Sequence, residues 1–403
     1  MPHAIRRTIL TVLLLGISGA LCWYGVSVNR LTVRDFVFVK NHFQVLQPFT
    51  DAWLLWGNLA YYDELDPRRA AADYRQAIVR QPTAIGAWLN LAKAELAAGR
   101  EDEARRILQT LSPLITHVST WKWQELLLAR DLQDEERFAA AFNFILARLP
   151  LRVSEASFLA KGFWGDSSAV LPHLAPGSRE AFLIELMKAK ESGPAFALWK
   201  TMQAADPPPG KGLQLRFCQF LLNNDRVGYA KEVWAAWRSD GKETVYDGGF
   251  EMEPTNKGFG WYLTRNPDAL VERSSEAPVE GRYSLHLRFL GLKNVNFWQV
   301  YQIIPVEGGR VYRLSFARKG QGLSTDQGVL LYVSGYQCEG LGVRSNPVLG
   351  TTSWTKEELE VHVPEGCEAI QLNVTRGESL MFDSKISGDY WLDSVELTEQ
   401  HAP

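Results

Sequence analysis

The sequence lacks an excess of charge of either sign. Its 403 residues include 43 Lys+Arg and 46 Asp+Glu, which gives a net charge of −3. A general nucleic-acid binder needs a basic excess to neutralise phosphates, so we expect no nucleic acid among its partners. The chain is too apolar for disorder, because 46% of its residues are hydrophobic. At about 100 to 200 residues per domain, its length predicts two or three domains.

The sequence also lacks the motifs of common catalytic sites. It contains no P-loop, no HExxH pair, no zinc-type CxxC pair and no GxSxG elbow. Glu251 and Glu253 lie two residues apart, whereas a glycosidase needs two carboxyl groups about 5 to 10 Å apart across the scissile bond in a substrate cleft. We therefore expect no catalytic residues and a protein that is not an enzyme. A glycan-active hydrolase, or an accessory subunit of one, is the less favoured alternative.

Cysteine is scarce, with four residues in the chain. Cys22 lies in an apolar segment and Cys218 in a helical pattern. Cys338 and Cys367 could pair if their domain faces an oxidising compartment. The sequence leaves the pairing open, and we favour two buried thiols.

The one long uncharged run lies near the amino terminus. No residue from Ile9 to Val28 is charged, and about 20 residues suffice for a helix to cross a hydrocarbon core of about 30 Å. Trp23 and Tyr24 resemble an interfacial aromatic belt. We expect a single-pass anchor over residues 1–29 and a juxtamembrane segment over 30–49. A cleaved signal peptide is the alternative, since Arg6 and Arg7 precede the run.

Residues 50–240 show a helical pattern in which Ala, Leu and Trp recur three and four positions apart. Ala70 and Ala104 lie 34 residues apart, as do Tyr74 and Leu108. Other positions of the pattern are Ala77, Pro82, Trp88, Leu91, Ala92, Glu95 and Gly99. The segment resembles the tetratricopeptide repeat family. The resemblance implies an all-α solenoid of stacked helix pairs that binds a protein partner.

More degenerate helical hairpins follow these two repeats. Residues 121–150 read as a hairpin broken at 131–134, and 178–204 give more helix. A last hairpin over 213–237 turns at Asn223-Asn224-Asp225. Residues 152–177 are less regular, and Pro207-Pro208-Pro209-Gly210 breaks the pattern.

After about residue 239 the period changes to two. Apolar residues alternate with polar ones in 283–289, 312–316, 358–363 and 370–374. Short strands separated by Gly, Pro and Asn, without helical crossovers, predict an all-β antiparallel sandwich over residues 241–403.

The order of signals in this second domain is more specific than the fold class. It opens with Asp247-Gly248-Gly249-Phe250-Glu251, passes Glu280-Gly281-Arg282-Tyr283-Ser284-Leu285 and Asn296-Phe297-Trp298-Gln299, and closes with Trp391-Leu392-Asp393-Ser394-Val395-Glu396-Leu397. Over residues 244–398 the domain resembles the jelly-roll carbohydrate-binding modules of families 4, 9 and 22. The resemblance implies a non-catalytic sandwich that binds a polysaccharide or oligosaccharide.

Side chains for sugar binding are predicted from this resemblance and from sugar chemistry. Aromatic faces stack on sugar C–H surfaces, while amide and guanidinium groups satisfy hydroxyls. The candidates are Trp298, Tyr336, Gln299, Gln302 and Arg376. The domain carries 15 Lys+Arg and 22 Asp+Glu, a net charge of −7, which favours a neutral glycan.

The resemblance also implies a structural calcium ion. Glu251 and Asp393 match the positions that hold it in many members, and hard oxygen ligands suit that ion. Carboxylates that cap backbone N–H groups are an equally good interpretation of both residues.

The chain contains 14 Trp, which suggests either sugar platforms or helix packing. Most of them fall in the helical region, and of the four in the sandwich we expect Trp261, Trp354 and Trp391 to be core residues and Trp298 to meet sugar.

Together these features predict a bacterial inner-membrane accessory protein. Its soluble domains would face the periplasm and serve the assembly or export of an exopolysaccharide or another envelope glycan. A purely structural protein–protein scaffold without sugar binding is the main alternative.

Overall fold

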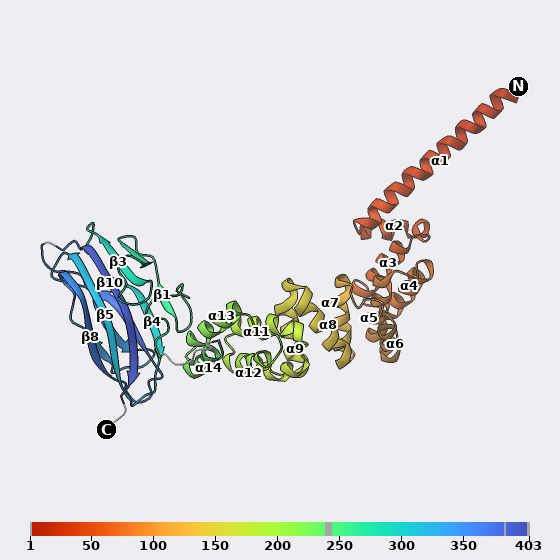
Figure 1. Cartoon of the computed structure of the whole chain (residues 1–403). Coiled ribbons are helices and arrows are strands. Elements are labelled where there is room, and N and C mark those ends of the chain that lie inside the picture. The colour runs from red at the N-terminus through yellow and green to blue at the C-terminus, as the bar shows by residue number, and fades with distance from the viewer. Residues whose placement is uncertain (1, 238–243, 383, 401–403) are drawn as a thin grey trace. The chain divides into compact units, whose positions relative to one another are not determined.

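The computed structural model describes residues 2–237, 244–382 and 384–400. The chain forms two compact units, Met1–Glu185 and Leu186–Pro403. The sequence placed a domain boundary between residues 240 and 241, which lies outside the described residues. Figure 1 shows helices throughout the first unit, and helices followed by two layers of strands in the second.

The helices of the first unit begin with a long apolar one and continue as antiparallel pairs. Their bounds are α1 Pro2–Thr32, α2 Phe36–Leu46, α3 Thr50–Tyr62, α4 Pro67–Arg80, α5 Ile85–Ala97, α6 Glu101–Leu111, α7 Ser119–Asp131, α8 Glu135–Arg148, α9 Val153–Trp164, α10 Ser167–Val170 and the beginning of α11 Arg179–Lys188. Short 3₁₀ turns occupy Pro150–Arg152, Leu171–His173 and Pro176–Ser178. The predicted hairpin over 121–150 is confirmed as α7 and α8.

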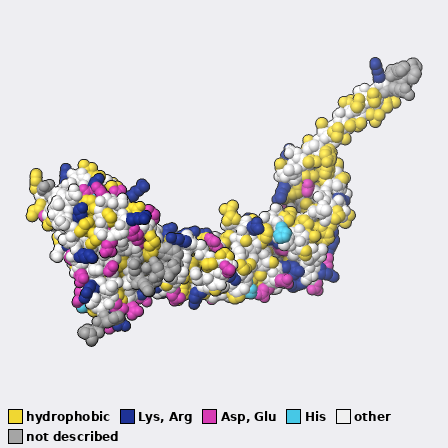
Figure 2. All heavy atoms as spheres, in the orientation of Figure 1, with side chains coloured by type: hydrophobic (Ala, Val, Ile, Leu, Met, Phe, Trp, Pro, Cys, Tyr) yellow, Lys and Arg dark blue, Asp and Glu magenta, His cyan; other side chains and the backbone are white. Residues whose placement is uncertain are grey.

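One helix, over Arg7–Thr32, is apolar and long enough to cross a membrane, with a mean hydropathy of 2.0. Figure 2 shows hydrophobic side chains along most of α1. From Arg7 to Val26 every residue of α1 is exposed, and Ser27 is the first buried one. Length and composition are equally those of a signal helix.

Small residues let the paired helices approach closely. Ala70, Ala77, Ala92 and Ala104 are fully buried, as the repeat pattern predicts. A Cβ atom on Gly57 of α3 would lie 2.5 Å from the Tyr74 ring of α4, so no larger residue fits there. Tyr74 itself is 1% exposed, and its hydroxyl donates to Asn58 Oδ1 at 2.8 Å.

The second unit begins with helices and ends in the sandwich. It contains the end of α11, then α12 Ser192–Gln203, α13 Lys211–Leu222 and α14 Val227–Trp237. The α13–α14 hairpin turns through Asp225, which has a φ of 58°. This confirms the hairpin that the sequence predicted over 213–237.

In the described part of the chain, ten strands form two antiparallel five-stranded sheets. Their bounds are β1 Trp261–Leu263, β2 Ala269–Ser274, β3 Ser284–Leu290, β4 Phe297–Pro305, β5 Val311–Leu323, β6 Leu330–Gly335, β7 Gly342–Arg344, β8 Gly350–His362, β9 Ala369–Arg376 and β10 Ser387–Glu399. Sheet A has the order β1-β4-β9-β6-β7, and sheet B has the order β2-β3-β10-β5-β8. The chain crosses between the sheets from β3 to β6 and again from β7 to β10 in the manner of a jelly roll, while β2–β3 and β6–β7 are hairpins within one sheet. This confirms the predicted sandwich.

The inward-facing residues of both sheets form one core. It includes Leu287 of β3, Leu314 of β5, Leu331 of β6 and Leu372 of β9, all 1% exposed or less. Because side chains alternate along a strand, the residues next to these point to the outer faces.

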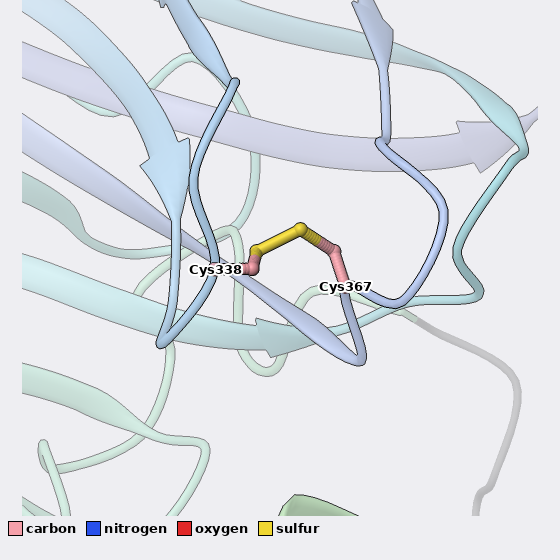
Figure 3. Close-up of a disulfide and its surroundings, with 2 residues drawn as sticks. All are labelled: Cys338 and Cys367. Atoms are coloured by element: carbon pink, nitrogen blue, oxygen red, sulfur yellow. A yellow bond between two sulfur atoms is a disulfide. The ribbon is translucent and has the colours of Figure 1, made fainter.

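Two of the cysteines are joined in a disulfide. The Cα atoms of Cys338 and Cys367 are 5.6 Å apart, and the bond links the β6–β7 loop to the β8–β9 loop (Figure 3). Our preference for two buried thiols was therefore wrong. The 29-residue separation gave no sign of the pairing, because the strand order brings the two loops together.

The tryptophans of the sandwich have three kinds of environment. Trp261 is 2% exposed and lies in the core, as predicted. Trp391 is buried but points outward from sheet B, where it stacks on His286 with ring centroids 4.8 Å apart. Trp354 lies half-buried on the edge strand β8. The expectation of a core position was therefore wrong for Trp354, whereas Trp391 is buried as expected but lies outside the cluster between the sheets.

Candidate functional site

A row of polar and aromatic side chains crosses the outer face of sheet A. Tyr301 of β4 pairs in register with Asn373 of β9, Asn373 pairs with Tyr332 of β6, and Tyr332 pairs with Arg344 of β7. Neighbouring strands lie about 4.8 Å apart, so this row extends about 14 Å across the sheet. We call these four residues the sheet A row.

The sheet A row faces outward because its neighbours along each strand face the core. Val300, Leu331, Val333, Leu372 and Val374 all belong to the core cluster. Tyr301, Tyr332 and Asn373 are half-buried, and Arg344 is exposed. Half-buried positions keep the side chains ordered while leaving part of each surface open.

Hydrogen bonds and ring contacts fix the sheet A row. Gln371 Nε2 donates to Asn373 Oδ1 at 2.7 Å, and Asn373 Nδ2 donates to the Tyr332 carbonyl at 3.4 Å. The Arg344 guanidinium carbon lies 5.0 Å from the centroid of the Tyr332 ring. The two tyrosine rings and the planar polar groups therefore present a prearranged surface.

Burial raises the pKa of the Tyr301 hydroxyl above its ordinary value. The phenol therefore stays protonated at neutral pH, where it can both donate and accept hydrogen bonds. As described, the five strands of sheet A contain no Asp or Glu. The acidic excess of the domain consequently lies in sheet B and the loops.

The α13–α14 hairpin packs on one side of the sandwich. Gln219 Oε1 accepts hydrogen bonds from the Tyr262 hydroxyl and from Gly258 N, the latter at 2.9 Å. Tyr262 is 7% exposed, and its ring stacks on Tyr301 with centroids 4.5 Å apart. The hairpin therefore supports the first tyrosine of the row through Tyr262.

The predicted sugar-binding residues do not form one group. Trp298 is 61% exposed at the start of β4, and the half-buried Gln299 accepts a hydrogen bond from Trp298 N at 3.0 Å. Tyr336 lies against the hairpin instead, where its hydroxyl donates to the Leu222 carbonyl at 3.3 Å.

Gln302 and Arg376 are fully buried. Gln302 Nε2 donates to the Tyr246 carbonyl at 2.7 Å, and Arg376 Nη1 donates to Asn294 Oδ1 at 2.8 Å. These positions are out of reach of a polysaccharide, and both side chains instead hold loops onto the inner side of sheet A.

Glu251 and Asp393 bind backbone N–H groups. Glu251 Oε1 accepts from Arg282 N at 2.7 Å and Tyr283 N at 3.0 Å, which lowers the pKa of Glu251. Asp393 Oδ2 accepts from Val279 N at 2.7 Å, yet burial raises its pKa. Among the described residues no group of three or more His, Cys, Asp or Glu is placed to hold a metal. Calcium binding stays a prediction. An ion here would share the carboxylates of Glu251 and Asp393 with these backbone N–H donors.

Glu253 does not form a catalytic pair with Glu251. Its carboxylate is almost fully exposed and binds Arg273, while Glu251 holds the 282–283 backbone. Neither residue lies in sheet A.

One comparison with known families matches part of the helical region. A family model described as "Tetratricopeptide repeat" matches residues 61–116, as the repeat spacing predicts. No curated protein matches the sequence.

Solved structures match the sandwich. The module TmCBM61 in complex with β-1,4-galactotriose is 19% identical with a TM-score of 0.29, covering 40% of this chain and 99% of that chain. The CBM22-1 xylan-binding domain of Paenibacillus barcinonensis Xyn10C is 16% identical with a TM-score of 0.26, covering 40% and 96%. A family 4 module is 16% identical with a TM-score of 0.29, covering 39% and 99%. The strand order of the two sheets carries the jelly-roll assignment.

None of the four residues of the sheet A row was predicted from the sequence as a binding residue. Each member alternates with core residues along its strand, and that signal is visible in Leu331-Tyr332-Val333 and Leu372-Asn373-Val374. Nothing local shows that β4, β9, β6 and β7 are neighbours, because the pairing joins strands far apart in the sequence.

Proposed function

We propose that this chain is a non-catalytic accessory protein that holds a polysaccharide on the outer face of sheet A. The observation that carries the proposal is the in-register row of Tyr301, Asn373, Tyr332 and Arg344. Tyrosine faces suit sugar C–H surfaces, and the amide and guanidinium groups suit hydroxyls. The strands supply Arg344 as the only exposed charge on this face among the described residues, and its guanidinium can donate to sugar hydroxyls. The net charge of −7 on the domain favours a neutral glycan.

The rest of the chain supports a proposed membrane location for this activity. In the proposal α1 anchors the protein in a bacterial inner membrane, and the tetratricopeptide repeats dock a protein partner. The Cys338–Cys367 disulfide supports a periplasmic location, because disulfides persist in oxidising compartments. Assembly or export of an exopolysaccharide or another envelope glycan is the process that combines these three features.

Affinity electrophoresis of the full chain in detergent tests sugar binding. Neutral polysaccharides of the envelope type are set into the gel, and at least one should retard the protein. A folded chain that none of a broad glycan panel retards would contradict the proposal and favour a structural scaffold.

Trp298 is tested in the same gels. Trp298→Ala should weaken retention without unfolding, because the side chain is 61% exposed. Unchanged retention would show that Trp298 does not contribute to binding and would leave the sheet A row as the candidate site.

A further inference from the structure

The helix α2 folds back along α1 toward the apolar end. Near the start of α2, Arg30 Nη1 of α1 binds Asp35 Oδ2 at 3.0 Å. Further along, the His42 and Trp23 ring centroids are 5.5 Å apart, and after α2 ends the Phe49 ring lies 5.6 Å from Tyr24. The corner between α2 and α3 therefore lies level with Tyr24 of α1.

The level of this corner limits where the bilayer surface can lie along the last turns of α1. Neither a surface before Trp23 nor a hydrocarbon core that extends to Val28 fits the structure. The free apolar stretch Ile9–Cys22 measures about 21 Å at about 1.5 Å per residue. The hydrocarbon core is about 30 Å thick, so α1 needs more apolar length than this stretch supplies. On its uncovered face the apolar surface continues, with Val26 47% and Val28 38% exposed.

A headgroup layer around Trp23–Val28 fits both observations, because a bilayer thins locally around an apolar stretch that is shorter than its hydrocarbon core. If the hydrocarbon core reached Val28, the polar α2–α3 corner would lie inside it. If water began at Trp23, the exposed Val26 and Val28 would lie in water. The headgroup and interfacial regions add about 5 to 8 Å on each side of the core, which is about the rise of these residues.

The corner has the side chains that such a layer favours. Trp53 Nε1 and Arg80 Nε both donate to the Gln47 carbonyl, at 2.8 and 2.7 Å. The Arg80 guanidinium carbon lies 4.7 Å from the Trp53 ring centroid. Near the end of α2, Val45 is 58% exposed. Indole rings and a guanidinium on an apolar stem are the groups that concentrate at membrane interfaces.

We propose that Trp23, Tyr24, Val45, Phe49, Trp53 and Arg80 form a membrane collar that lies in the headgroup layer of the bilayer entered by α1. This inference rests on the proposed anchor. Because Arg80 ends α4, the collar seats the first repeat directly on the membrane. Residues 30–49 then act as a structured support and not as a free linker.

Single fluorescent labels test the collar in the full chain, reconstituted in vesicles of phosphatidylcholine and phosphatidylglycerol. The background is Cys22→Ala, and an environment-sensitive label is attached to Leu14→Cys, Val37→Cys or Val45→Cys. All three side chains are at least half exposed, so labelling leaves the packing intact. Val37 and Val45 lie on the same helix, about 12 Å apart along its axis, and form a matched pair.

Nitroxides on the lipid headgroup or deep in the acyl chain quench the label nearest to them. We expect loss of emission at Val45 with the headgroup nitroxide and at Leu14 with the deep nitroxide. At Val37, about 12 Å farther along α2 from the apolar end of α1, we expect a smaller loss with the headgroup nitroxide. A label at Val45 that stays in water while Leu14 is quenched would overturn the collar and leave the anchor standing. An unquenched Leu14 would instead remove the anchor, and the collar with it. Equal quenching at Val37 and Val45 would also overturn the collar.

Discussion

At the scale of single residues, Asp73 is a buried carboxylate within the repeats. It is 8% exposed in α4, and its Oδ2 accepts no hydrogen bond from a described residue. Burial raises its pKa to about 6, and the nearby Arg69 offsets this only in part. The folded state therefore holds a proton that the unfolded chain releases near pH 4, so the stability contributed by this residue falls as pH rises from about 4 to about 6.

Asp73→Asn should remove this pH dependence. Above pH 6 the variant is expected to be more stable than the parent protein by about 1 to 3 kcal/mol, and below pH 4 the two should agree. Hydrogen exchange of the α4 amides, taken as the difference between the two proteins at each pH, measures the effect. Asp102→Asn, at an exposed position, is the control. A difference that does not change with pH would contradict the assignment.

Residue-scale predictions from sequence succeeded where the pattern was local. The burial of Ala70, Ala77, Ala92 and Ala104 follows from their spacing in the repeats. Trp354 was wrongly expected in the core, and the buried Trp391 lies on the outer face of its sheet, because the pattern along a strand does not reveal which face of the sheet a side chain occupies. That depends on the neighbouring strands.

At the scale of elements, the disulfide joins two loops that the sheets bring together. It closes a loop of 29 residues, which should stabilise the sandwich by about 3 to 4 kcal/mol through the entropy of the unfolded chain. Reduction should therefore lower the temperature at which the sandwich unfolds, as measured by near-ultraviolet circular dichroism. The Cys338→Ser/Cys367→Ser double variant should unfold at the same temperature as the reduced parent protein, and adding reductant should not change that temperature. Equal stability of oxidised and reduced protein would contradict a structural role.

The hairpin α13–α14 is an element of the sandwich unit as well as the last helical pair. Gly258 has a φ of 63°, and a Cβ atom there would lie 2.7 Å from the Trp234 ring and 3.2 Å from Cys218 Sγ. Gly322 has the same φ, but a Cβ atom there would meet nothing within 4 Å. The two glycines thus share the backbone requirement and differ in packing.

Gly258→Ala should loosen the hairpin from the sandwich, and Gly322→Ala should not. Both carry the strain of a left-handed backbone, about 1 to 2 kcal/mol, and overpacking adds about 1 to 3 kcal/mol at Gly258. Hydrogen exchange of the α13 and α14 amides reports the difference. Equal exchange in both variants would show that the contact with Trp234 contributes nothing.

At the scale of the whole molecule, the order of the parts followed from the sequence. The apolar run, the change of period near residue 239 and the repeat spacing each depend on neighbours along the chain. The candidate site did not follow, since Tyr301, Asn373, Tyr332 and Arg344 meet only through pairing of distant strands. The buried positions of Gln302 and Arg376 were hidden for the same reason.

The division of the chain also differs from a simple series of domains. The second compact unit begins at Leu186 and includes the α13–α14 hairpin together with both sheets. The Tyr262 ring stacks on Tyr301, and the Tyr262 hydroxyl donates to Gln219 of α13. The α13–α14 hairpin therefore covers Tyr262. Sugar binding should therefore be measured on the full chain, because removing the hairpin would expose Tyr262.

The most direct measurement compares two aromatic truncations in the full chain, titrated with the polysaccharide that retards it most. Tyr332 belongs to the sheet A row, and Trp354 lies half-buried on β8 of the other sheet. Tyr332→Ala should lose about 0.5 to 1.5 kcal/mol of stacking, a fall in affinity of up to about tenfold, with its fold intact. Trp354→Ala should bind as the parent protein does. A folded Tyr332→Ala protein that binds with unchanged affinity, or a Trp354→Ala protein that is weakened as much, would contradict sugar binding on sheet A.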